Sequence, residues 1–146
     1  MAMRVALVSC VKSKRPSAAP ARDLYISPLF TALRCYAQSH ADRWYILSAK
    51  HGLLEPNKVI EPYELTLASM PKAARLAWAE RVRNQLLQIL PPNAEIILLA
   101  GSRYRENLES FLLEHGFSVS APLRGLSLGR MLHWLNSSST RSSDDC

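Results

Sequence analysis

The chain has 146 residues, of which 48% are hydrophobic and 21% are charged. This length indicates one folded domain, and this composition excludes a chain that is disordered throughout. Eighteen Lys and Arg residues against twelve Asp and Glu residues give a formal net charge of +6. The positive excess favours an anionic partner such as nucleic acid, a nucleotide or an acidic membrane surface.

The three cysteines are Cys10, Cys35 and Cys146, and no two of them form a CxxC pair. Three cysteines cannot all pair with one another, and the first residues do not resemble a secretion signal, so we expect a reduced protein in the cytoplasm. No run approaches the roughly 20 apolar residues that cross a bilayer, so we expect no membrane-spanning segment.

Short apolar runs alternate with helical periodicity along the chain. The strands expected from these runs are residues 5–8, 44–47, 96–100 and 117–119. Helices are expected from Ser27 to about His40, from about residue 69 to Pro91, over residues 105–114, and after Pro122. We expect residues 53–67, with two prolines, to be irregular, and residues 137–146 to form a disordered tail after a single domain at 1–136.

This alternation predicts an α/β fold, a three-layer α/β/α arrangement with a mainly parallel sheet of about four strands. Ligands bind such sheets outside the carboxyl ends of the strands. The loops that begin at Ser9, Ser48 and Gly101 should therefore share one crevice, with Lys12, His51 and Tyr104 facing a common cavity.

The loop after the first strand is the most basic. Lys12 and Lys14 lie beside exposed backbone N–H groups, which together can hold a phosphate. A solvated basic loop is the competing interpretation. Cys10 can be a nucleophile activated by these cations, although a buried structural cysteine is the favoured reading.

The loop after the second strand places Ser48, Lys50 and His51 at one strand end. Histidine suits proton transfer or stabilisation of a developing anion near neutral pH, unless it merely caps or packs. The segment that follows carries Tyr63 and Glu64 and has prolines before and after it. We expect this segment to lie over the crevice.

The loop after the third strand combines Gly101, Ser102, Arg103 and Tyr104. Arginine and tyrosine can bind a backbone phosphate and stack on a base, although Tyr104 can equally be the first apolar residue of its helix. Arg124 lies in a further turn suited to anions.

The carboxylates available for general acid or base work are Asp23, Glu61 and Glu64. The histidines and cysteines lack the spacing of a zinc site, so we expect neither a metal nor an organic cofactor.

Four segments, residues 9–14, 23–30, 47–54 and 60–67, resemble a small bacterial and phage domain of unknown function, and that domain is similar to the YaaA family of peroxide-stress, DNA-binding proteins. The likeness to the small domain spans about residues 4–135. The positions that match the YaaA pattern are Ser9, Lys12, Tyr25, Ser48, Gly52, Leu54, Pro62, Tyr63, Leu65, Ala100, Tyr104 and the pair Arg124-Gly125.

The chain departs from YaaA in two ways. YaaA proteins are longer and carry a helix-hairpin-helix DNA-binding element for which this chain has no room, and they have no counterpart to His51. The resemblance therefore implies DNA binding by the basic crevice itself. Parts of tRNA base-exchange and archaeosine-type enzymes are also similar, and the predicted layout resembles that of uracil-DNA glycosylases.

The favoured hypothesis is a monofunctional DNA glycosylase that extrudes a modified pyrimidine, such as a 5-substituted uracil, and hydrolyses its N-glycosidic bond. Lys12, Lys14 and Arg103 would hold phosphates, and Tyr25 or Tyr63 would stack on the base. His51 would stabilise the departing base, while Asp23 or Glu64 would position water. The alternatives are a non-catalytic DNA- or nucleotide-binding protein of stress protection and an N-glycosidase or base transferase acting on free nucleosides or nucleotides. We expect a monomer.

Overall fold

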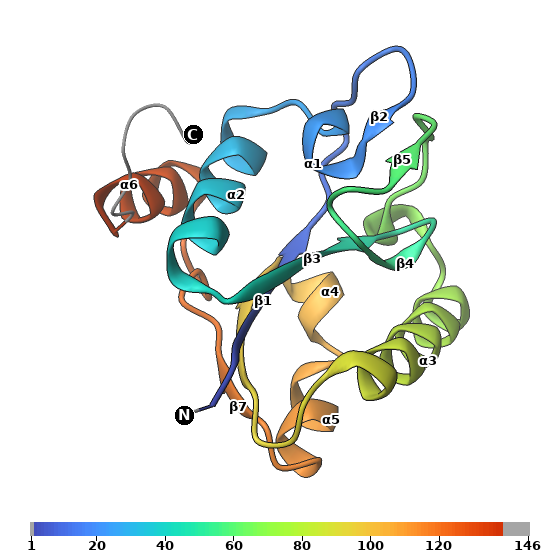
Figure 1. Cartoon of the computed structure of the whole chain (residues 1–146). Coiled ribbons are helices and arrows are strands. Elements are labelled where there is room, and N and C mark those ends of the chain that lie inside the picture. The colour runs from blue at the N-terminus through green and yellow to red at the C-terminus, as the bar shows by residue number, and fades with distance from the viewer. Residues whose placement is uncertain (1, 139–146) are drawn as a thin grey trace.

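The computed structural model describes residues 2–138, and its centre is a five-stranded sheet (Figure 1). The strands are β1 (Arg4–Ser9), β3 (Arg43–Ser48), β4 (Gly52–Leu54), β6 (Glu95–Leu99) and β7 (Ser118–Ser120). They lie in the order β4-β3-β1-β6-β7. All neighbours are parallel except β4, which is antiparallel to β3. The sheet is therefore mixed but mostly parallel.

Helices cover both faces of the sheet. The longer ones are α2 (Pro28–His40), α3 (Lys72–Ile89) and α6 (Leu128–Ser138), and the shorter ones are α4 (Ser102–Arg105) and α5 (Glu109–Glu114). Figure 1 shows α2 and α6 on one side, with α3, α4 and α5 on the other. Ser27 caps α2 as the sequence predicts, because its Oγ accepts a hydrogen bond from Phe30 N at 3.0 Å.

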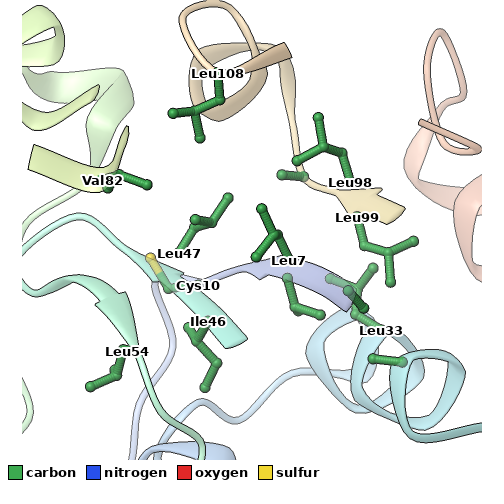
Figure 2. Close-up of a cluster of buried hydrophobic side chains, with 14 of the residues drawn as sticks. Leu7, Cys10, Leu33, Ile46, Leu47, Leu54, Val82, Leu98, Leu99 and Leu108 are labelled. Carbon is green, nitrogen blue, oxygen red and sulfur yellow. The ribbon is translucent and has the colours of Figure 1, made fainter. Parts of the chain in front are cut away.

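The core follows from strand register. Leu7 and Leu98 are opposite one another in the sheet, and Figure 2 shows them with Leu47 on the side of Val82 and Leu108. Ile46 and Leu99 lie on the other side, with Leu33 of α2. Because both faces are covered, the four consecutive residues 5–8 of β1 are all buried, which explains the unbroken apolar run in the sequence.

A smaller assembly stands at the carboxyl ends of β1 and β3. It consists of β2 (Ala19–Pro20), antiparallel to β5 (Val59–Ile60), with α1 (Ala21–Leu24) beside them. Figure 1 shows it beyond the end of the sheet at which β1 ends. A short 3₁₀ helix, η1 (Leu67–Ser69), follows β5 before α3 begins.

The structure confirms the α/β class, the mostly parallel sheet and its four predicted strands. The predicted sheet was one strand short, because β4 lies at the start of the segment expected to be irregular. The predicted third helix is divided into α4 and α5. Helix α6 includes residues 137 and 138, which the sequence analysis assigned to the tail, and the remainder of that expected tail, 139–146, lies outside the described residues.

Gly52 makes the unpredicted hairpin between β3 and β4 possible. Its φ of +72° lies in the left-handed region, and a Cβ added there would lie 2.5 Å from Gln85 Oε1 of α3. The same Gln85 oxygen accepts a hydrogen bond from Leu53 N at 2.9 Å. The absence of a side chain at Gly52 therefore lets α3 dock against the edge of the sheet.

Candidate functional site

The strand order places a topological switch point between β1 and β6. From β1 the chain crosses to β3 on one side, and it later returns to β6 on the other side of β1. Ligands of open α/β sheets bind at the carboxyl end of such a point. Here Cys10 follows β1 and Tyr104 follows β6, and their Sγ and hydroxyl groups are 3.2 Å apart. The first and third predicted loops therefore meet at the switch point.

A buried set of hydroxyl groups joins the first and second loops. The Tyr63 hydroxyl lies 2.6 Å from the Tyr25 hydroxyl and 2.7 Å from Ser48 Oγ. Ser48 Oγ also accepts a hydrogen bond from His51 N at 3.0 Å. We refer to Tyr25, Tyr63 and Ser48 as the hydroxyl network. All three are buried, and Ser48 is fully so, so the network holds the carboxyl end of β3 against the segment after β5.

Trp78 of α3 contacts the hydroxyl network from the side of the sheet that α3 covers. Its Nε1 donates to the Ser48 carbonyl oxygen at 2.8 Å, and its ring packs edge-on to that of Tyr104 at 5.6 Å. The sequence analysis assigned Trp78 no role. An indole N–H needs a partner when buried, and this requirement is the signal that sequence reasoning missed.

The phenols of the site remain protonated well above neutral pH. Burial raises the pKa of Tyr25 to about 12, and burial also raises the pKa values of Tyr63 and Tyr104. Protonated phenols both donate and accept, so Tyr63 can bond Tyr25 and Ser48 at once. Tyr25 and Tyr63 are only 3% and 9% exposed, which leaves little ring surface for the base stacking expected of them.

A cavity of about 560 Å³ lies in front of the hydroxyl network. Its walls come from the loop after β1 and from the segment between β5 and η1. The residues that line it are Lys12, Ser13, Lys14, Glu64, Leu65, Thr66 and Ser69. We call this space the lysine cavity. Two ammonium groups, three hydroxyls and a carboxylate converge there, and its volume is in the range of small-molecule sites.

Lys14 connects the lysine cavity to the hydroxyl network. Its Nζ lies 4.4 Å from the centre of the Tyr63 ring and donates to the Lys12 carbonyl oxygen at 3.0 Å. Burial lowers the pKa of Lys14, while the nearby Cys10 and Glu64 counteract part of that effect. Lys12, by contrast, is exposed.

His51 adjoins the network but does not line the lysine cavity. Its ring packs edge-on to Tyr63 at 5.5 Å, and its buried Nε2 has no hydrogen-bond partner. Burial lowers the pKa of His51, and the positive charges of Lys50, Lys58 and Arg81 lower it further. Tyr104 does not line the cavity either, and its hydroxyl lies 3.2 Å from Cys10 Sγ. We expected Lys12, His51 and Tyr104 to face one common cavity. That prediction is wrong for the lysine cavity, because only Lys12 of the three lines it.

The cations around His51 continue those of the lysine cavity. Lys50 Nζ lies 5.9 Å from the centre of the Tyr63 ring that Lys14 also contacts. Arg81 donates to the Lys50 carbonyl oxygen at 2.8 Å. We refer to Lys12, Lys14, Lys50, Lys58 and Arg81 as the cationic strip. The sequence analysis assigned no functional role to Lys58 or Arg81.

Asp23 lies apart from the lysine cavity. Its carboxylate pairs with Arg34 at 3.2 Å and with Arg22 at 3.6 Å. It lines a different cavity of about 410 Å³, together with Arg15 and Tyr25. Asp23, which the sequence analysis expected to position water, is therefore held in ion pairs and lines a different cavity from Glu64.

The remaining predicted binding residues do not line the lysine cavity either. Arg103 pairs with Glu106 at 3.6 Å, and Arg124 pairs with Glu109. Ser102 and Arg124 line a third depression near α5, and Gly101 caps α4. Ser9 forms the last residue of β1. In the third loop, therefore, Tyr104 is the residue whose side chain meets Cys10 at the switch point.

Two broader features concern the described part of the chain. Within residues 2–138, no three His, Cys, Asp or Glu side chains gather into a group suited to a metal ion. No helix within those residues is both long and apolar enough to cross a membrane.

Comparison with known proteins assigns the chain to a family without assigning an activity. Residues 5–137 match a family of unknown function, DUF6884, and the chain belongs to this family. An uncharacterized protein of Bacillus subtilis (strain 168), YfjM, is 33% identical over 142 residues, which cover 91% of this chain and 93% of YfjM. No solved structure matches the chain.

Proposed function

We propose that the protein binds DNA and hydrolyses the N-glycosidic bond of one nucleotide, a modified pyrimidine such as a 5-substituted uracil, held in the lysine cavity. The observation that carries this proposal is the meeting of Lys12, Lys14 and Glu64 in one cavity at the carboxyl end of the sheet. The lysines suit a phosphate, and the carboxylate suits the activation of water. The cytoplasm is the proposed location.

The reaction assigns Glu64 the role of general base. Water adds its oxygen to C1′ of the sugar and gives a proton to the Glu64 carboxylate. The bond from C1′ to the base nitrogen breaks, and its electron pair leaves with the base, which then takes up a proton. A positioned carboxylate contributes roughly 100- to 10,000-fold to the rate of such a step.

The cationic strip favours a polynucleotide over a free nucleotide. Lys50, Lys58 and Arg81 extend the positive charge beyond the lysine cavity, and Lys14 and Lys50 approach the same ring. A strand carries a phosphate at each nucleotide, so it can contact more of the five cations of the strip than a single nucleotide can. The proposed substrate is therefore an extruded nucleotide within DNA.

The proposal includes a relation to the YaaA family and to the layout of uracil-DNA glycosylases. It is supported by the positions that match the YaaA pattern. Lys12 lines the lysine cavity, while Tyr25, Ser48 and Tyr63 form the network behind it and Tyr104 lies at the switch point. Residues far apart in the sequence thus gather at one end of the sheet, as a shared binding function requires.

One observation favours the alternative of DNA or nucleotide binding without catalysis. His51 and Asp23, two of the three predicted catalytic residues, do not line the lysine cavity, and Asp23 is held by two arginines. The test therefore measures binding and base release on the same samples.

The test uses duplex and single-stranded oligonucleotides that contain uracil or 5-substituted uracils. After incubation, heating in alkali converts each abasic site into a strand break. We expect breaks with the wild-type protein, none with Glu64→Gln, and unchanged breaks with the matched variant Glu106→Gln. Salt-sensitive binding without breaks on any substrate would support the non-catalytic alternative, and base release from free nucleosides alone would support an N-glycosidase of small substrates.

A further inference from the structure

We propose that Lys14 is an amine nucleophile that forms an imine with the C1′ aldehyde of an abasic site in DNA. This inference rests on the proposed function, because base release leaves such a sugar in the lysine cavity. It adds a second activity, the cleavage of the strand beside the abasic site.

The backbone around Lys14 is fixed from both sides. Lys14 pairs with Tyr25 as an isolated β-bridge. Arg15 N donates to the Leu24 carbonyl oxygen at 2.9 Å, and Ile26 N donates to the Ser13 carbonyl oxygen at 2.9 Å. These bonds hold the loop after β1 against the chain that precedes α2. A nucleophile needs such positioning to meet its target in a defined geometry.

The side chain of Lys14 is held as well, but without a carboxylate partner. Its Nζ bonds the Lys12 carbonyl oxygen at 3.0 Å and lies over the rings of Tyr63 and Tyr25, at 4.4 and 5.6 Å. Within residues 2–138, none of the ion pairs includes a lysine. The ammonium group is therefore partly desolvated and not neutralised by a direct ion pair.

This environment increases the fraction of neutral amine. Burial lowers the pKa of Lys14, and only a neutral amine has the electron pair that attacks a carbonyl carbon. Lys12 lines the same cavity from the same loop but is exposed, so the two lysines form a natural pair for comparison. Lys14 is the one that the fold prepares for covalent chemistry.

Lys14 and Glu64 together can carry out every step of the reaction. Lys14 Nζ attacks the C1′ carbonyl carbon, and loss of water gives a protonated imine. The Glu64 carboxylate then accepts a proton from C2′, the bond between C3′ and its oxygen breaks, and the 3′ phosphate leaves with the electron pair. Hydrolysis of the imine releases the sugar and restores the lysine. No oxidant or reductant takes part.

Trapping with borohydride tests this step directly. A duplex oligonucleotide with one prepared abasic site is incubated with the full-length protein and sodium borohydride, which reduces an imine to a stable amine. We expect a covalent protein–DNA adduct on a denaturing gel and peptide mass spectrometry that locates it on Lys14. Lys14→Arg keeps the positive charge and should lose the adduct, whereas Lys72→Arg, at an exposed position of α3, should retain it.

The inference fails if the wild-type protein forms no adduct, if Lys14→Arg forms as much, or if the adduct maps to another amine. Release of labelled base is measured in parallel. Base release without an adduct overturns the role of Lys14 and leaves the proposed function standing. An adduct without base release overturns the glycosylase and keeps the imine chemistry on abasic sites.

A probe that contains no DNA covers the case of a misfolded variant. Pyridoxal 5′-phosphate carries both an aldehyde and a phosphate, and the wild-type protein can be labelled with it and reduced. Peptide mapping then compares Lys14 with Lys12 in one folded sample. We expect preferential labelling of Lys14, and preferential labelling of Lys12 would overturn the inference.

Discussion

The lysines of the cationic strip differ from the arginines beside α4 and α5. Near α4 and α5, Glu106 pairs with Arg75 at 3.0 Å and with Arg103 at 3.6 Å, and Arg124 pairs with Glu109. The lysines of the cationic strip make none of the ion pairs found within residues 2–138. Positive charge is therefore compensated in one region and left open in the other.

This difference separates structural cations from cations available to a ligand. An arginine that already bonds a carboxylate must give up that partner before it binds a phosphate, which costs free energy. The lysines of the cationic strip have no carboxylate partner of this kind to give up. Both kinds of cation contribute equally to the net charge of the sequence. Only the ion pairs in the structure distinguish the arginines from the lysines.

The largest effect is expected from Glu64→Gln, compared with Glu106→Gln. Glu64 lines the lysine cavity, whereas Glu106 is occupied by two arginines. We expect Glu64→Gln to reduce the rate of base release by about 100-fold or more, because the amide cannot take a proton from water. Glu106→Gln should leave that rate unchanged. Equal reductions in both variants, measured by single-turnover assays, would contradict the role of Glu64.

The second prediction concerns the hydroxyl network. Ser48→Ala leaves the Tyr63 hydroxyl and His51 N without their buried partner, so we expect the free energy of unfolding to fall by about 1–3 kcal/mol. Ser118→Ala, at an exposed position of β7, should change it by less than about 0.5 kcal/mol. Urea denaturation measures both variants, and similar values would show that the network adds no stability.

The parts of the fold that could be predicted are those with long, repetitive patterns. Residues 5–8 and 96–100 are unbroken apolar runs, and α2 begins at a serine cap followed by proline. Strand β4 has only three residues, too few for any periodicity, and its hairpin depends on the positive φ of Gly52 and its contact with Gln85. Such a contact with a distant helix leaves no local signal.

The candidate site was predictable by region but not by partner. The sequence analysis put the loop of Lys12 and Lys14 at a crevice and the segment of Glu64 over it, and these three residues line one cavity. The sequence could not show that Asp23 pairs with Arg34, or that Trp78 bonds the Ser48 carbonyl. Both contacts join elements that are separated in the chain, so they depend on the packing of helices and not on the spacing of residues.

The third prediction compares Lys12→Ala with Arg103→Ala in DNA binding. Removing one cation that binds a phosphate should reduce the slope of log affinity against log salt by about one. We expect that reduction for Lys12→Ala and a smaller one for Arg103→Ala, because Arg103 is already paired with Glu106. Fluorescence titrations of a labelled oligonucleotide at several salt concentrations measure both slopes. Equal slopes would remove the distinction between open and paired cations.

The smallest effect is expected from His51, and it depends on pH. Burial and the charges of Lys50, Lys58 and Arg81 lower its pKa in the folded protein below the ordinary value of 6.5. As the pH falls from 6.5 towards that lower value, the unfolded chain takes up a proton that the folded protein refuses, so the free energy of unfolding decreases. Below the folded pKa both states carry the proton, and the contribution stops changing.

Urea titrations across this range should show a smaller acid-dependent decrease in His51→Gln than in the wild type. His133→Gln, at an exposed position of α6, should follow the wild type, and a profile of His51→Gln that also follows it would show that the open positive charge near Tyr63 does not act on the histidine.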